Sequence, residues 1–394
     1  MNRTVKIEDY GYNGEGVGKT DGKVCFVPKT VIGENVEVVI DKENSKFCKA
    51  TVCKVLQKSE KRIEPRCPYY STCGGCNFQH ITYEDELEIK KKIFLKEFSK
   101  IQKLADVDVI KSEKDYGYRN KIRLAVKQKT LGFYQEGTKK FVQVDACLLG
   151  SEVINKAIKK VSVFLKNTTH IFNEIVFMDF ENECLIDFLT DEKVDINEIK
   201  KTLDFKIEIN HIGDYVSTQN QGLNLTYNGE AFRQVNDIVA QKLYNEVLAN
   251  VEGKSVVNAY SGGGVLSALL CQKADTVYGI EINKSAHIVA EKLKKSNGIK
   301  NMTNICGDSE KEIGKIKNFD CVVIDPPRAG CFKGFLDALL SKSAETIIYI
   351  SCNISTFVRD LKCLKEKYLI EKVKLFDMFP RTANFESFAV LRRK

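Results

Sequence analysis

Residues 255–282 read SVVNAYSGGGVLSALLCQKADTVYGIEI, and this stretch decides the fold of the C-terminal half of the chain. A run of β-branched residues leads into a glycine turn, an apolar helical segment follows, and a second β-branched run ends at Glu281. A strand, a crossover helix and a second strand in this order are typical of a parallel sheet covered by helices. We therefore predict a doubly wound α/β sheet.

The same alternation begins near residue 216 and continues to the C-terminus. We expect five parallel strands followed by a terminal pair. The parallel strands are predicted at 255–260, 276–282, 304–308, 319–325 and 346–352, and the terminal pair at 373–379 and 387–394. Such a Rossmann-like sheet binds its ligands at the carboxyl edge of the strands.

Two different patterns precede this sheet, so we divide the chain into three domains at 1–57, 58–215 and 216–394. The first segment alternates apolar and polar residues around glycine turns, which predicts a small antiparallel β-barrel. Barrels of this kind bind single-stranded nucleic acid or serve as structural appendages. The second segment contains a charged helix at 83–101 and strand-like runs, which predicts a mixed α+β central domain.

Composition favours a globular protein with a polyanionic partner. The chain has 394 residues, of which 43% are hydrophobic and 29% charged, and 61 Lys and Arg against 53 Asp and Glu give a net charge of +8. Its beginning lacks an apolar signal run, and no stretch of about 18 apolar residues follows. We expect a cytoplasmic protein without a membrane partner, acting as a monomer, whose clustered cysteines are ligands or nucleophiles.

A cofactor site is predicted at the glycine turn. Gly262 lies in a run of three glycines that lets the backbone approach a ligand, and Glu281 ends the next strand where it can accept hydrogen bonds from ribose. Asp308 ends a third strand and can accept from an adenine amino group. Because the turn lacks the Gly-x-Gly-x-x-Gly spacing of dinucleotide sites, S-adenosylmethionine fits this set better than NAD.

A reaction site is predicted at the same edge. One strand runs into Asp325-Pro-Pro-Arg328, another into Cys352, and Glu386 precedes the last strand. A thiolate that adds to carbon 6 of uracil makes carbon 5 nucleophilic towards a methyl donor, and a carboxylate can then remove the carbon 5 proton. The same residues could instead be a buried strand-end thiol and an exposed loop carboxylate.

Four cysteines have the spacing of a metal site. Cys67, Cys73 and Cys76 form a Cys-x5-Cys-x2-Cys run, and Cys147 is a distant fourth thiol. Zinc and iron-sulfur clusters both take four sulfur ligands, so the spacing does not separate them.

A basic and aromatic run lies in the central segment. Tyr118, Arg119, Lys121 and Arg123 interleave a ring with cations that could stack on bases and meet phosphates. A solvated strand face is the alternative.

The chain also resembles a known family. The runs DPPRAG at 325–330, SCN at 351–353, FP-x-T-x-x-x-E at 379–386 and FRQVN at 232–236 resemble the RNA uracil-5-methyltransferases. The resemblance spans nearly the whole chain, because 1–57 resembles a TRAM domain and the cysteine spacing resembles that of the iron-sulfur 23S rRNA enzymes.

The resemblance implies a role for each candidate residue. Cys352 would be the nucleophile, Glu386 the base and Asp325 the carboxylate that orients the uracil at the edge of the donor site. Cys331 is a rival thiol, because cytosine-5-methyltransferases carry a cysteine near a proline loop, but Cys352 is favoured. The donor pocket would contain Gln234, on a helix at 230–248, together with Tyr260, Gly262, Glu281, Asp308 and Asp325.

The resemblance also implies the cofactors and the substrate. They are S-adenosylmethionine, a 4Fe-4S cluster on the four cysteines, and RNA contacts by residues 118–123. The expected substrate is 23S rRNA, with tRNA uridine 54 or a non-catalytic RNA-binding role as alternatives. Asn258 and Asn384 depart from the family pattern, which usually has Asp and His there.

Overall fold

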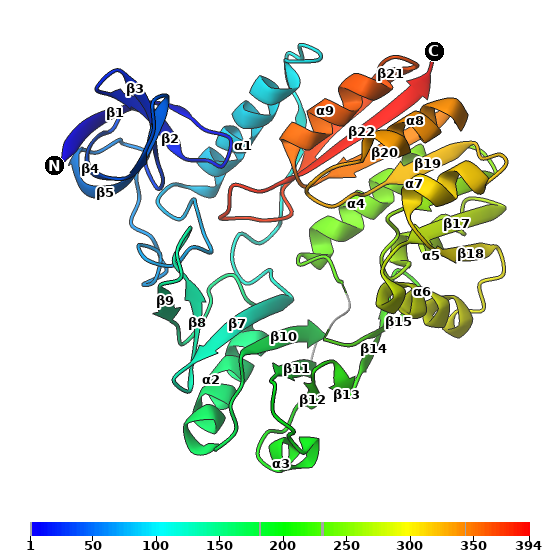
Figure 1. The fold of residues 1–394 in the computed structure, drawn as a ribbon, viewed down its shortest axis with the longest axis horizontal. Helices are drawn as coiled ribbons and strands as arrows, with labels where there is room; N and C mark the ends of the chain where they lie inside the picture. Colours follow the sequence, from blue (N-terminus) through cyan, green and yellow to red (C-terminus); the bar gives the residue numbers. More distant parts are fainter. Residues whose placement is uncertain (1, 181–182, 230–231, 343) are drawn as a thin grey trace.

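The computed structural model describes residues 2–180, 183–229, 232–342 and 344–394, and these form three regions around one junction (Figure 1). The N-terminal region is a closed barrel with the strand order β1-β2-β3-β5-β4. Alternate residues such as Val5 and Ile7 point into it and are buried. Its strands are β1 (Arg3–Tyr10), β2 (Gly16–Thr20), β3 (Lys23–Val27), β4 (Asn35–Glu43) and β5 (Phe47–Gln57).

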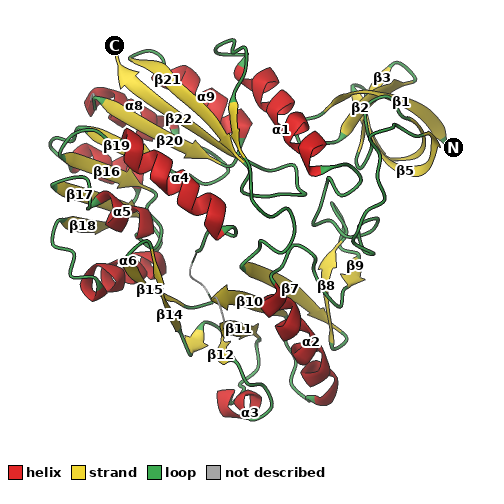
Figure 2. Ribbon diagram, turned by 180° about the vertical axis from the view of Figure 1, so that it is seen from behind, coloured by secondary structure: helices red, strands yellow, loops and turns green. Residues whose placement is uncertain are grey.

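The central region is a seven-stranded sheet in the order β13-β12-β11-β10-β7-β8-β9, with helix α2 (Glu152–Asn167) packed on it (Figure 2). Its predicted strand-like runs are confirmed as the pairs β7–β8 and β10–β11. The strands are β7 (Lys121–Lys127), β8 (Thr130–Tyr134), β9 (Phe141–Gln143), β10 (Glu174–Phe180), β11 (Glu183–Leu189), β12 (Lys206–Ile209) and β13 (Ile212–Gly213), with the short helix α3 (Ile196–Lys200).

The C-terminal region is an eight-stranded sheet in the order β18-β17-β16-β19-β20-β22-β21-β6. All seven predicted strands are present, the first five parallel and the terminal pair antiparallel. The strands are β6 (Asp108–Ile110), β16 (Ser255–Ala259), β17 (Thr276–Glu281), β18 (Met302–Cys306), β19 (Cys321–Ile324), β20 (Thr346–Ser351), β21 (Tyr368–Phe376) and β22 (Glu386–Arg393). The predicted α/β fold class with its barrel and mixed central region is thereby confirmed. The barrel differs from the prediction in one respect, because β3 and β5 pair in parallel, whereas its other strand pairs are antiparallel.

Helices cover this sheet, and a hairpin joins it to the central region. The hairpin is β14 (Val216–Asn220) and β15 (Leu223–Tyr227). The helices are α4 (Asp237–Asn250), α5 (Val265–Leu270), α6 (Lys284–Ser296), α7 (Ser309–Glu312), α8 (Lys333–Lys342) and α9 (Ile354–Leu364), and a 3₁₀ turn covers Ile313–Lys315. In the described part of the chain, no helix is both long enough and apolar enough to span a membrane.

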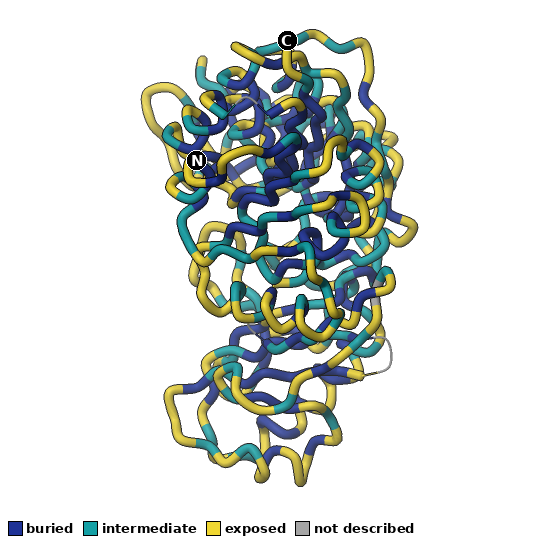
Figure 3. Tube along the Cα trace, turned by 90° about the vertical axis from the view of Figure 1, so that its right-hand side faces the viewer, coloured by how far each residue is buried: buried dark blue, intermediate teal, exposed yellow. Residues whose placement is uncertain are grey.

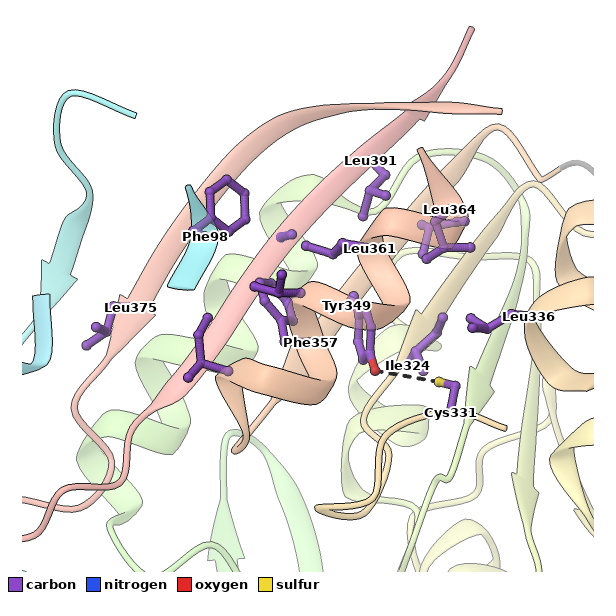
Figure 4. Packing of buried hydrophobic residues seen from close by; sticks show 14 of the residues in the cluster. Phe98, Ile324, Cys331, Leu336, Tyr349, Phe357, Leu361, Leu364, Leu375 and Leu391 are labelled. Carbon is purple, nitrogen blue, oxygen red and sulfur yellow. Dashed lines mark hydrogen bonds between the residues drawn. The ribbon is translucent and has the colours of Figure 1, made fainter. Parts of the chain in front are cut away.

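Two elements of the segment 58–215 pack with the C-terminal sheet instead of the central one. Helix α1 (Tyr83–Phe98) contacts α9, and the rings of Phe98 and Phe357 are 6.5 Å apart within the same core (Figure 4). Strand β6 pairs in parallel with β21. The segment between the barrel and the central sheet is therefore anchored on the C-terminal sheet. Buried residues lie mostly in the interior of the molecule and exposed ones along its outline (Figure 3).

Candidate active site

The carboxyl ends of three neighbouring parallel strands bring the predicted reaction residues to one edge. Strand pairing sets Ala259, Ile324 and Tyr349 side by side on β16, β19 and β20. Asp325 follows β19 directly, and Cys352 follows β20 after Ser351. Common strand direction is thus enough to collect these side chains at the sheet edge.

Glu386 reaches this edge by a different route. It is the first residue of β22, which runs antiparallel to β20 with Ser351 opposite Ser387. The residue after Ser351 and the residue before Ser387 are Cys352 and Glu386, so the strand register sets thiol and carboxylate next to each other. The two side chains are close enough for the negative charge of Glu386 to raise the pKa of Cys352.

Burial dominates the electrostatics of the two carboxylates. Glu386 is 5% exposed, and its Oε2 atom has no hydrogen-bond partner among the described residues. Burial and then the charge of Asp325 raise the pKa of Glu386 well above its usual value, while Arg328 opposes the rise. Burial also raises the pKa of Asp325 to about 7. Two buried carboxyls this close disfavour ionisation of both at once, so the site can hold a proton near neutral pH.

Cys352 is half-buried, and burial followed by the Glu386 charge raises its pKa to about 11. Arg328, from the loop after β19, opposes this through its charge and a hydrogen bond. The thiol is therefore mostly protonated at neutral pH and reacts only after losing its proton.

An open cavity of about 440 Å³ lies over Cys352. All three regions of the molecule contribute to its wall. The barrel supplies Tyr12 and Asn13, the central segment supplies Gly74, Asn77 and Glu136, and the C-terminal sheet supplies Arg328, Cys352, Asn353, Ile354, Ala383, Asn384 and Phe385. A space of this size and polarity suits an extruded nucleotide.

The barrel residues at this cavity were missed by sequence reasoning. The Tyr12 hydroxyl donates to Oδ1 of Asn353, the residue after Cys352. Asn353 in turn donates to the Arg328 carbonyl oxygen at 2.9 Å and caps α9 through the Ser355 amide at 3.0 Å. The only sequence signal was an aromatic residue in a glycine turn, which does not reveal what the turn faces.

A second pocket of about 90 Å³ adjoins the glycine turn. It is lined by Gln234, Asn258, Tyr260, Gly262 and Asp325 among others. The backbone of Tyr260 has a positive φ of 61°, and Gly262 one of 54°, so the chain turns sharply at the end of β16. Asp325, which is predicted for both the donor site and the reaction site, thus lies in the wall of this pocket.

Gln234 is not on a helix, which corrects the prediction of a helix over 230–248; residues 230–231 of that span lie outside the described residues. Helix α4 begins at Asp237, and Asn236 is its N-cap, with its side chain accepting from the Val239 amide. The backbone oxygen of Gln234 accepts from the Asn120 side chain at 2.9 Å, which fixes this loop against the central region.

Glu281 is the last residue of β17, and Asp308 lies two residues after the end of β18. Neither residue lines the pocket itself. Glu281 accepts hydrogen bonds from the amides of Gly262 at 2.8 Å and Asn283 at 2.7 Å, so it holds the glycine turn. Asp308 caps α7 by accepting from the Glu310 amide at 3.1 Å. In this structure Glu281 supports the glycine turn of the pocket, and Asp308 caps a helix.

The rival thiol Cys331 faces the protein core. It is 4% exposed, its Sγ lies 3.7 Å from the Tyr349 hydroxyl, and its amide donates to Asp360 at 2.8 Å (Figure 4). Burial raises its pKa to about 12. A nucleobase bound in the cavity over Cys352 would not reach the sulfur of Cys331, which does not line that cavity.

The four candidate ligand cysteines line one small cavity of about 50 Å³. Cys67, Cys73 and Cys76 lie in the loop after the barrel and meet Cys147, and all fourteen cysteines of the chain are free thiols. Within the described residues, no three His, Cys, Asp or Glu side chains are arranged as a metal site as they stand. The geometry thus brings the four cysteines to one cavity.

The residues expected to contact RNA do not share one open face. Tyr118 is 8% exposed and donates to the Pro380 oxygen at 3.0 Å, so its side chain is buried in this structure. Arg119 lines the cysteine cavity, and Lys121 donates to the Gly229 oxygen at 2.9 Å. Arg123 remains at the surface, paired with Glu174 at 3.0 Å.

Comparisons with known proteins agree with this architecture. The tRNA (uracil-5-)-methyltransferase family model matches residues 178–394, and the TRAM domain model matches residues 2–53. An uncharacterized RNA methyltransferase of Clostridium acetobutylicum is 33% identical over 99% of this chain and 96% of its own length. Another from Aquifex aeolicus is 32% identical over 99% of this chain and 98% of its own length.

A solved structure shows the same fold along nearly the whole chain. The tRNA (uracil-54, C5)-methyltransferase of Pyrococcus abyssi, in complex with S-adenosyl-L-homocysteine, aligns with a TM-score of 0.80 at 24% identity. The alignment covers 99% of this chain and 100% of that one. The family resemblance of the sequence motifs is confirmed: this chain is an enzyme that belongs to the RNA uracil-5-methyltransferase family.

Proposed function

We propose that this enzyme methylates carbon 5 of a uridine in RNA with S-adenosylmethionine as donor and Cys352 as covalent nucleophile. The observation that carries the proposal is the antiparallel pairing of β20 with β22. It sets a thiol that lines a nucleotide-sized cavity next to a buried carboxylate, at the sheet edge that also carries the pocket at the glycine turn.

The residues of the glycine-turn pocket fit the donor. Asn258 lines the pocket, and its buried Oδ1 has no hydrogen-bond partner among the described residues, so it could serve as an acceptor for a ligand amino group. Gln234, Tyr260, Gly262 and Asp325 would surround the donor, and Glu281 and Asp308 would hold the loops or accept from its ribose and adenine. When bound there, S-adenosylmethionine supplies an electrophilic methyl group. Asn258 keeps an acceptor where the family usually has Asp.

The nucleophilic step belongs to Cys352. Its thiolate forms a bond to carbon 6 of uracil, and the electron pair of the carbon 5–carbon 6 double bond moves towards oxygen 4. Carbon 5 then becomes nucleophilic enough to accept a methyl group. Arg328 favours the thiolate, because its charge lowers the pKa of Cys352. Asp325 would orient the uracil by hydrogen bonding to its polar edge, and a pKa of about 7 lets it donate or accept.

The final step belongs to Glu386. Its carboxylate removes the proton from carbon 5, the double bond re-forms, and the sulfur of Cys352 leaves carbon 6. A raised pKa makes Glu386 a stronger base than an exposed carboxylate once it is ionised. Asn384, which lines the cavity two residues before the base, cannot supply the charge that a histidine would.

We further propose that RNA binds across the three regions, with residues 1–57 as the RNA-binding barrel, 58–215 as the region of the cysteine site and 216–394 as the methyl-transfer region. The barrel residues at the cavity support this division of labour. Lys121 and Arg123 are proposed to contact RNA from the central sheet, and Arg119 from the wall of the cavity that the four cysteines line. We also propose that the protein acts on RNA in the cytoplasm as a monomer.

The proposed substrate is 23S rRNA, because four cysteines at the spacing of the iron-sulfur rRNA enzymes line one cavity. Uridine 54 of tRNA is the second candidate, since the Pyrococcus abyssi enzyme that shares the fold acts there by its name. Deleting the gene should remove 5-methyluridine from 23S rRNA and leave tRNA unchanged. Mass spectrometry of nuclease digests of both RNAs measures this. Loss from tRNA alone would favour the second candidate, and no loss from either RNA would contradict the proposed function.

We also propose that Cys67, Cys73, Cys76 and Cys147 hold a 4Fe-4S cluster. The donor set fits, because four thiols line one cavity and sulfur is the ligand that such clusters require. Protein purified without oxygen should contain about four iron and four sulfide atoms per chain, the content of one cluster. Cys147→Ser should lose them, whereas Cys53→Ser, an exposed cysteine of the barrel, should retain them. Zinc without iron would contradict the proposal.

A further inference from the structure

The base Glu386 is held at the end of a loop that makes no regular structure of its own. This base loop, residues 377–385, connects β21 to β22 and reaches away from the sheet towards α1 and the chain that follows the barrel (Figure 1). Its residues Ala383, Asn384 and Phe385 line the cavity over Cys352. The position of the loop therefore governs where the base carboxylate meets a bound uracil.

A buried charge network anchors the first part of the base loop. Lys90 of α1 is completely buried and donates to Asp377 at 2.5 Å and to the Phe379 oxygen at 3.2 Å. Glu86 of the same helix accepts from the Arg381 amide at 2.7 Å. These contacts fix the half of the loop that lies furthest from the base in sequence.

The part closer to the base is held by the cysteine loop, which we define as residues 67–81. The amides of Asn77 and Phe78 donate to the Arg381 oxygen at 2.9 Å and 3.2 Å. The Ala383 amide donates to Oδ1 of Asn77 at 3.0 Å. Asn77 thus contacts the base loop on both sides of Thr382.

Asn77 also links this contact to the cysteine site. It directly follows Cys76, and its carbonyl oxygen accepts from the Tyr70 hydroxyl at 2.5 Å. Arg381 of the base loop also donates from Nη1 to the oxygen of Ile81, the last residue of the cysteine loop, at 3.0 Å. The cysteine loop and the base loop therefore interlock at the wall of the cavity.

We propose that Asn77 is a positioning residue for Glu386 and that the cysteine loop serves the reaction by holding the base loop in place. This inference rests on the proposed role of Glu386 as the base. It gives the cysteine site a mechanical task in methylation that needs no electron transfer. Misplacement of the base should slow release of the covalent adduct and leave the attack by Cys352 intact.

The test compares Asn77→Ala with Asn77→Asp, which keeps the acceptor for the Ala383 amide. With RNA containing ordinary uridine, Asn77→Ala should lower kcat about ten- to a hundred-fold, the range expected for a base displaced by up to about 1 Å. The KM for RNA should stay near the wild-type value, and the covalent adduct should accumulate on denaturing gels. Asn77→Asp should restore most of kcat and remove the accumulated adduct.

Two measurements separate this inference from its alternatives. The rate of adduct formation with 5-fluorouridine RNA should be unchanged in Asn77→Ala, which also shows that the variant is folded, and Ser71→Ala on the exposed part of the same loop should match the wild type. If Asn77→Ala is poorly folded, Asn77→Ser must reproduce the slow adduct release. Equal loss of adduct formation in the Ala and Asp variants, or unchanged adduct release in Asn77→Ala, would overturn the inference. A wild-type enzyme that forms no adduct would overturn the proposed function itself.

Discussion

Replacing Cys352 by alanine is expected to abolish methylation, lowering kcat/KM for uridine in RNA by at least about 10⁴-fold, the scale on which loss of a covalent nucleophile acts. Without the sulfur, carbon 5 of uracil stays too poor in electrons to take up a methyl group, whatever the other residues do. The covalent complex with 5-fluorouridine RNA should disappear as well. Transfer of a labelled methyl group and denaturing gels measure the two effects.

Cys331→Ala is the matched control for the nucleophile. Cys331 lies in the loop after β19, but its sulfur is buried beside Tyr349. Its loss should lower stability through the cavity left behind, by about 1–3 kcal/mol, and should leave adduct formation intact. A Cys352→Ala enzyme that still methylates, or a Cys331→Ala enzyme that does not, would contradict the assignment.

The reactivity of the Cys352 thiol should also depend on pH. Because burial and the Glu386 charge raise the pKa of Cys352 to about 11, alkylation of this thiol in the RNA-free enzyme should become faster as the pH rises towards that value. The rate rises with pH, since deprotonation makes the reactive form. Mass spectrometry after timed treatment with iodoacetamide measures it. A pH-independent rate between about pH 6 and 9 would mean that the thiolate is already formed.

Sequence patterns were sufficient for the C-terminal sheet because its geometry is local. A parallel strand ends where its β-branched run ends, and all such ends share one edge, so Asp325 and Cys352 could be placed without knowing the strand order. The pairing of β20 with β22 could not be read, yet it is this pairing that sets Glu386 beside Cys352. Asn236 carried a readable N-cap signal, which would have excluded Gln234 from the helix.

The remaining site features depend on contacts between distant segments. Tyr118 sits among basic residues in the sequence, but the base loop covers it through Pro380, and no local pattern encodes that cover. Tyr12 and Asn77 reach the cavity only because the barrel, α1 and the C-terminal sheet pack around one junction. Side chains contributed by one sheet edge can be predicted from sequence, whereas those contributed across such a junction depend on tertiary packing.

Replacing Glu386 by glutamine should trap the enzyme on its product. Glutamine keeps the shape of the side chain but does not take up the carbon 5 proton, so Cys352 remains bonded to carbon 6 of the methylated base. Turnover should fall about 10²- to 10⁴-fold, the usual contribution of a general base. The covalent complex should then accumulate with ordinary uridine RNA and should carry the transferred methyl group.

The pH dependence and stability of Glu386→Gln distinguish a lost base from a damaged fold. Release of the wild-type adduct requires ionised Glu386, whose pKa is raised by burial and by Asp325, so release should speed up as the pH rises, and this rise should vanish in Glu386→Gln. The variant also removes one of two neighbouring buried carboxyls, so its Tm should not fall below that of the wild type. Glu371→Gln, an exposed change on β21 that breaks only an ion pair with Arg392, should leave adduct release unaffected. If Glu386→Gln instead releases methylated RNA at the wild-type rate, another group removes the proton, and the carboxylate beside Cys352 has a different task.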